Sequence, residues 1–66
     1  MHDRWYDYSN KILEAESDLG PLTKGQRCDL LLDNFPEISD SKAALSVIGL
    51  LTHEKLISIS VERNNL

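Results

Sequence analysis

The stretch ALSVIGLLTHEKLISISVE, residues 44–62, changes from a helical to an alternating apolar pattern within a few residues. Its first half repeats apolar side chains at steps of three and four, which predicts an amphipathic helix. Its second half, from residue 56 to residue 62, alternates apolar and polar side chains, which predicts a half-buried strand. One strand constrains the fold strongly, because the backbone groups of a half-buried strand must pair with a neighbour.

The rest of the chain offers that strand few neighbours. The segment 21–23 and the tail after Arg63 could each pair with it over one or two residues. Otherwise the strand edge is open to the same strand of a second copy, or to a strand of another protein. We therefore expect the strand to lie at an interface. Its apolar side chains, the expected contacts, are Ile57, Ile59 and Val61.

The first of three expected helices spans residues 3–19. Apolar side chains recur along it at steps of three and four, the spacing of one helix face. Gly20 and Pro21 end it, because glycine favours a helix C-terminus and proline cannot continue the hydrogen-bond ladder. The apolar residues of this face are Trp5, Tyr8, Ile12, Ala15 and Leu19.

The second expected helix spans residues 24–35. Thr23 followed by Gln26 is the capping-box pattern, in which a hydroxyl and an amide side chain satisfy free backbone N–H groups. Pro36 ends the helix, since proline disfavours a helical residue before it. The apolar stripe of this helix consists of Cys28, Leu31, Leu32 and Phe35.

The third expected helix begins after Ser39 or Asp40, both favourable N-caps. A wide apolar surface that includes Leu45 and Leu50 predicts that this helix is the central and most buried one. Gly49 within it suggests the close approach of a neighbouring helix or a partner.

These elements predict a mostly α fold with a small β element, in which three helices are followed by one strand. We expect a single small domain over residues 1–66, with an acidic N-terminal helix over 3–19 and a core over 21–62. A chain of 66 residues has a small core, so its stability depends on good packing or on self-association. The single cysteine, Cys28, excludes an internal disulfide, and no His and Cys residues are spaced for zinc.

The chain is acidic, with a net charge of −4 at neutral pH. Five acidic and two basic side chains fall within residues 1–20, so the acidity belongs mainly to the first helix. This balance argues against nonspecific binding to nucleic acid or an anionic membrane, because both need clustered lysine and arginine. The N-terminus has no apolar run and no segment is long enough to span a membrane, so we expect a cytoplasmic protein.

Three short segments share their order with a known DNA-binding fold. They are PLT at 21–23, SDSKAALSVIGLL at 39–51 and KLISISVE at 55–62. With these segments, residues 22–62 resemble a winged helix-turn-helix domain, in which they would be the first β-segment, the recognition helix and the start of the wing. Lys55 stands where that family usually has glycine, and the second wing strand is missing. The resemblance implies a dimeric DNA-binding regulator. The residues it places near DNA are Lys24, Arg27, Lys42, Ser46 and Arg63.

Aromatic residues gather at the start of the first helix, at Trp5, Tyr6 and Tyr8. Trp and Tyr are enriched at binding hot spots, so these side chains are candidates for protein interaction. The alternative is that Trp5 and Tyr8 pack onto the core while Tyr6 stays exposed. The helical periodicity requires the face with Trp5 and Tyr8 to be in the core, and it does not require the face with Tyr6 to be buried.

Residues with catalytic or metal-binding chemistry form no recognisable constellation. Cys28 lies on the apolar stripe of the second helix, so a buried structural thiol is expected rather than a nucleophile. His53 precedes Glu54, but the HExxH zinc motif needs a histidine where Ile57 stands. The glycines form no phosphate-binding loop. We therefore expect no enzyme activity, no cofactor, no metal and no small-molecule substrate.

Three functions stay open at this point. The first is a small regulatory or adaptor protein without enzyme activity, which binds another protein or a second copy of itself through the strand edge and the aromatic helix. The second is a winged-helix DNA-binding regulator. The third is an acidic antagonist that imitates nucleic acid and blocks a nucleic-acid-binding protein.

Overall fold

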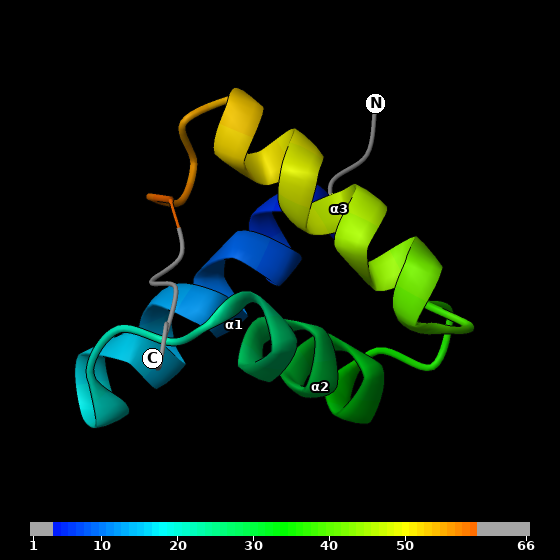
Figure 1. Cartoon of the computed structure of the whole chain (residues 1–66), viewed down its shortest axis with the longest axis horizontal. Coiled ribbons are helices and arrows are strands. Elements are labelled where there is room, and N and C mark those ends of the chain that lie inside the picture. The colour runs from blue at the N-terminus through cyan, green and yellow to red at the C-terminus, as the bar shows by residue number, and fades with distance from the viewer. Residues whose placement is uncertain (1–3, 60–66) are drawn as a thin grey trace, which may run out of the picture.

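The computed structural model describes residues 4–59, which form three helices (Figure 1). Helix α1 spans Arg4–Leu19, α2 spans Lys24–Asn34 and α3 spans Ser41–His53. The predicted mostly helical fold is therefore confirmed. No helix in this part of the chain has the length and apolar character needed to cross a membrane.

The helix starts follow the capping residues in the sequence. The Gln26 N–H donates to the Thr23 hydroxyl at 3.2 Å, and the Thr23 N–H donates to the Gln26 side-chain oxygen at 2.9 Å. This reciprocal pair is the expected capping box. At the start of α3 the Asp40 carboxylate accepts from the Ala43 N–H at 2.9 Å, so Asp40 is the N-cap. Gly20, with φ of 88°, follows the end of α1.

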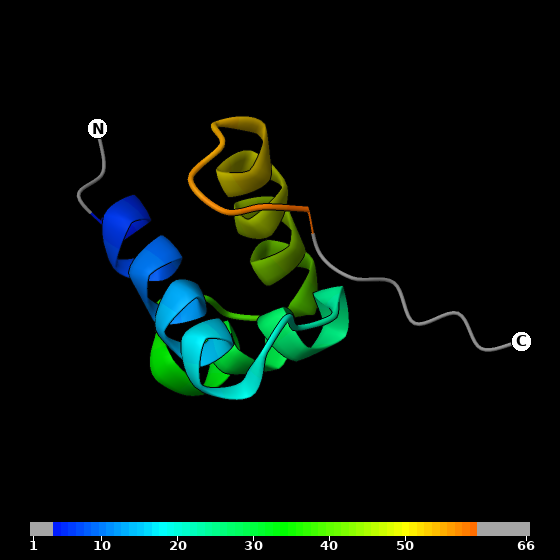
Figure 2. The ribbon, with the colours of Figure 1, turned by 90° about the vertical axis from the view of Figure 1, so that its left-hand side faces the viewer.

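The end of α3 turns the chain back on itself. The Lys55 N–H donates to the Thr52 carbonyl at 3.0 Å, and the Leu56 N–H donates to the Leu51 carbonyl at 2.9 Å. These two bonds form a Schellman motif, whose central residue adopts the left-handed conformation. Lys55 holds that position with φ of 64°. Figures 1 and 2 show the following segment returning from the helix end instead of continuing along it.

The predicted strand over 56–62 is wrong wherever the structure describes it. Residues 56–59 form no strand, and residues 60–62, with Val61, lie outside the described part of the chain. Ile57 is 4% exposed and Ile59 is 81% exposed, so the two do not share a face as strand alternation requires. Instead, Leu56, the last residue of the Schellman motif, packs against the core. Among residues 4–59 the one β feature is an isolated bridge at Thr23.

The core lies where the three helices meet. It also takes in Ile38 before α3 and Ile57 after it. Most predicted stripe residues are there, but Leu19 at the end of α1 is 75% exposed. The buried cluster consists of Tyr8, Ile12, Cys28, Leu31, Phe35, Ile38, Ala44, Ile48, Leu51 and Ile57.

The prediction that α3 is buried on a wide surface is also wrong. Leu45 is 42% exposed and Leu50 is 45% exposed, so only one side of the helix enters the core. Beyond the nearby turns of α3 itself, no atom in residues 4–59 lies within 4 Å of a Cβ placed on Gly49, so neither α1 nor α2 packs there. The two leucines point away from the core because each lies about 100° or more around the helix from Ala44 and from Leu51.

Candidate protein-interaction site

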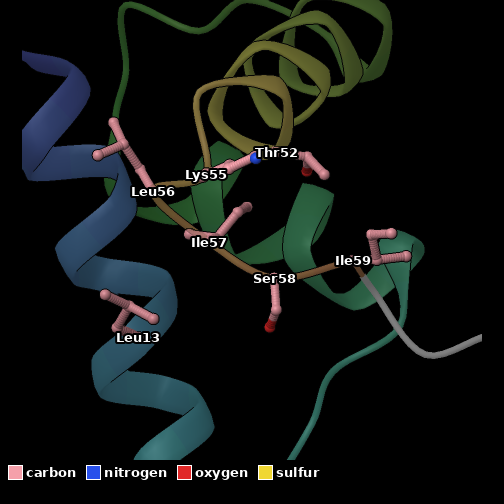
Figure 3. A pocket seen from close by; sticks show the side chains of 7 residues that line it. All are labelled: Leu13, Thr52, Lys55, Leu56, Ile57, Ser58 and Ile59. Carbon is pink, nitrogen blue, oxygen red and sulfur yellow. The ribbon is translucent and has the colours of Figure 1, made fainter.

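An open apolar groove of about 450 Å3 lies between α1 and the segment that follows α3 (Figure 3). Leu13 contributes from α1 and Thr52 from α3, while the remaining lining residues are consecutive along the returning segment. The described residues of the groove walls carry no carboxylate and no imidazole. The lining residues are Leu13, Thr52, Lys55, Leu56, Ile57, Ser58 and Ile59.

Two large apolar side chains of the groove face solvent. Leu13 is 45% exposed and Ile59 is 81% exposed, whereas Ile57 is buried. Of the interaction residues predicted on the strand, Ile59 therefore lies on the groove and Ile57 belongs to the core. Figure 3 shows Leu13 and Ile59 at opposite ends of the groove, with Ile57 and Ser58 between them.

The returning segment is held by a buried arginine. Arg27 of α2 is 1% exposed, and its Nη1 donates to the Ser58 carbonyl at 2.9 Å. Its Nε and Nη2 donate to Glu16 Oε2 of α1 at 2.9 and 2.6 Å. The same carboxylate oxygen accepts from the Leu22 N–H at 3.2 Å. The groove therefore has a wall fixed to α1 and α2.

Arg27 cannot serve as the phosphate contact that the winged-helix resemblance implied. Its guanidinium is enclosed and already donates to Glu16 and Ser58, so it has no surface on which to meet DNA. The other candidates on described residues, Lys24, Lys42 and Ser46, are exposed. Arg63 lies outside the described residues.

Sequence reasoning named Arg27 only as a DNA contact, and it did not name Leu13 or Glu16. Arg27 precedes Cys28 and lies four residues before Leu31, which places it beside the apolar stripe of α2. That position was a usable sign of burial. Its partner could not be assigned, because Glu16 is one of several acids on α1 and only the helix packing brings it near.

The aromatic group at the start of α1 divides between core and surface. Tyr8 is buried, with its ring 4.7 Å from that of Phe35 at an edge-to-face angle of 81°. Trp5 is half-buried and packs against the core, whereas Tyr6 is 62% exposed. This is the alternative in which Trp5 and Tyr8 pack onto the core while Tyr6 stays exposed. Among the described aromatic side chains, Tyr6 is therefore the one most accessible to a partner.

A charged cluster fastens α1 to the turn after α2. The guanidinium of Arg4 donates to Glu37 Oε2 at 2.7 and 2.9 Å, and to Asp7 at 3.1 Å. The Tyr8 hydroxyl donates to the same Glu37 oxygen at 2.9 Å.

The hydrogen bonds from Arg4 lower the pKa of Glu37. Burial, followed by the Glu37 carboxylate, raises the pKa of Tyr8. The guanidinium also lies 5.2 Å from the Phe35 ring centre.

Cys28 is a buried free thiol. Burial raises its pKa, and Asp29 raises it further, so the reactive thiolate is disfavoured. Within residues 4–59 no three His, Cys, Asp or Glu side chains are grouped closely enough to hold a metal ion.

No protein-family model, curated protein or solved structure matches this chain. The winged helix-turn-helix resemblance therefore stays a prediction based on the residues that carry it.

Proposed function

We propose that this chain is a small non-enzymatic adaptor or regulatory protein that binds another protein through the groove of Figure 3. The observation that carries the proposal is the exposure of Leu13 and Ile59 on one groove whose wall Arg27 fixes. A preorganised apolar surface with a polar rim has the anatomy of a binding interface. Lys55 on the rim favours a partner segment that combines apolar side chains with an acidic one.

The electrostatics support binding rather than catalysis. The two arginines of α1 and α2 are engaged in ion pairs, Arg4 with Glu37 and Arg27 with Glu16. Among the described residues, Lys55 is the one titratable side chain of the groove lining, so no second acid or base stands beside it to form a catalytic pair. A cytoplasmic location belongs to this proposal, because a free cysteine persists in reducing compartments.

The two other functions have weaker support. For a winged-helix regulator, the outer side of the recognition helix would carry Leu45 and Leu50 where base contacts need polar side chains. For an acidic antagonist, most carboxylates of α1 would need to be free. Three of them are paired with bases instead: Asp7 with Arg4, Glu14 with Lys11 and Glu16 with Arg27. A salt titration of duplex DNA binding separates the DNA-binding function from ours, since phosphate contacts give a steep slope.

The proposal is tested by partner capture from the cells that make the protein. The bait is the full chain, compared with Leu13→Glu, Ile59→Lys and the control Leu19→Glu. Leu19 is 75% exposed on the same helix as Leu13 but does not line the groove. We expect a partner that wild type and Leu19→Glu retain and that both groove variants lose by about tenfold or more.

The two groove variants add opposite charges, so a common loss cannot come from the chain's net charge. Circular dichroism confirms that each variant is folded. Retention of the same proteins by all four baits contradicts the proposal.

A further inference from the structure

Lys55 combines a strained backbone with a free charge. It follows α3 in a left-handed conformation, with φ of 64°, which glycine adopts without strain and a residue with a Cβ does not. Its side chain is exposed, and its ammonium makes no hydrogen bond or ion pair with another residue of 4–59. The fold therefore gives this lysine no polar contact at a position where its side chain costs stability.

Lys55 is also the one charged side chain among the described residues that line the groove. Figure 3 shows it on the α3 side of the groove, with Leu13 of α1 on the other side. Strained residues persist where the surrounding structure holds them, and they gather at binding and active sites. Both its strain and its place on the groove therefore indicate that the ammonium of Lys55 is used in binding.

The groove defines the chemistry of its occupant. Its volume of about 450 Å3 lies within the range of ligand sites and admits a short peptide segment rather than a folded domain. The exposed Leu13 and Ile59 at its two ends favour apolar side chains on that segment. A segment that covers the groove also removes water from the ammonium of Lys55, and a desolvated charge needs an opposite charge beside it. An aspartate or glutamate of the segment supplies that charge.

We infer that Lys55 selects the partner of the groove by pairing with an aspartate or glutamate side chain of a short apolar segment. This inference rests on the proposed function, since it names the group that the partner must present. The net charge of the chain, −4, repels acidic partners at a distance. The attraction of Lys55 therefore acts on a segment that Leu13 and Ile59 already hold. Lys55 determines specificity, while the apolar ends of the groove supply affinity.

A random peptide library displayed on phage tests the inference, with the immobilised full chain as bait. Wild type should enrich peptides in which an acidic residue stands beside apolar ones, and Leu13→Glu should lose them. Lys55→Glu reverses the charge of the groove and should enrich lysine and arginine in place of the acids. Lys42→Glu is the matched control, because Lys42 is exposed on α3 but does not line the groove. It should enrich the same peptides as wild type.

The affinities of one enriched peptide separate recognition from stability. Replacing its acidic residue by the corresponding amide should weaken binding to wild type by about fivefold, the size of a partly exposed ion pair. The same replacement should leave binding to Lys55→Gly unchanged. Lys55→Gly also relieves the left-handed strain, so it should bind the acidic peptide less tightly than wild type while being more stable. A lysine with a structural role alone would not separate these two effects.

Two results overturn the inference. One is that wild type and Lys55→Glu enrich peptides of the same charge, and the other is that wild type enriches no peptide that Leu13→Glu loses. Neither result decides the proposed function, because that is measured by capture of a cellular partner with the Leu13 and Ile59 variants. Conversely, a partner captured through the groove whose binding Lys55→Glu does not weaken leaves the proposed function in place and overturns the role of Lys55.

Discussion

Glu37 shows how one exposed carboxylate can organise several side chains. It accepts hydrogen bonds from Arg4 and from the Tyr8 hydroxyl on a single oxygen. Because its pKa is lowered in the fold, its contribution to stability is present above its ordinary pKa of 4.5. That contribution is lost as the pH falls through the lowered value. For Tyr8, whose pKa is raised, the contribution is present below its ordinary pKa and is lost as the pH rises through the raised value.

The pKa of Tyr8 gives a direct measurement of this cluster. In a Tyr6→Phe background Tyr8 is the only tyrosine, so its ionisation can be followed by tyrosinate absorbance. We expect a midpoint above the ordinary value of 10.0, because burial and the Glu37 carboxylate both disfavour the phenolate. Adding Glu37→Gln should lower the midpoint, since it removes a negative charge while burial remains. Glu54→Gln, at the end of α3, is the control and should have no effect. A midpoint that Glu37→Gln leaves in place would show that the hydrogen bond does not form.

At the scale of elements, the helices were predictable because their signals are local. The Thr23 and Gln26 capping box and the Asp40 N-cap act within one turn, and each begins a helix as expected. The strand was not predictable from alternation alone, because a strand depends on a neighbour. Ile57 and Ile59 fit the alternating pattern, yet the Schellman motif at Lys55 turns the chain and buries only Ile57.

The end of α3 is less stable than it could be. Lys55 adopts a left-handed conformation with φ of 64°, in which a Cβ is unfavourable and glycine is preferred. Lys55→Gly should therefore raise the free energy of unfolding by about 1 kcal/mol, measured by urea unfolding. Lys24→Gly is the control, because Lys24 begins α2 as a helical residue and glycine there should destabilise. An equal loss of stability in both variants would contradict the Schellman geometry.

At the scale of the whole molecule, one ion pair connects segments that are distant in sequence. Arg27 of α2 binds Glu16 of α1 and the Ser58 carbonyl after α3, while Glu16 accepts from the Leu22 backbone. No periodicity predicts this connection, since it depends on how the helices pack. The groove was predictable only in part. Ile59 could be named from the sequence, whereas Leu13 and Arg27 are brought to the groove by the packing of the helices.

The stability of the whole chain should depend on Arg27 far more than on the half-exposed Arg4. Arg27→Met removes three hydrogen bonds and leaves the Glu16 carboxylate, 15% exposed, without its cation. Breaking a buried pair in this way costs about 3–5 kcal/mol, as much as a core of this size supplies. We therefore expect urea unfolding to show a largely unfolded Arg27→Met variant. The Arg4→Met variant loses ion pairs that are solvated, so it should stay folded with a smaller loss of stability.

The double variant Arg27→Met with Glu16→Met removes both charges and should recover part of the stability that Arg27→Met loses. Recovery stays incomplete because the Ser58 carbonyl and the Leu22 N–H lose their partners. Equal stability of Arg27→Met and Arg4→Met would mean that the three helices hold together without this pair.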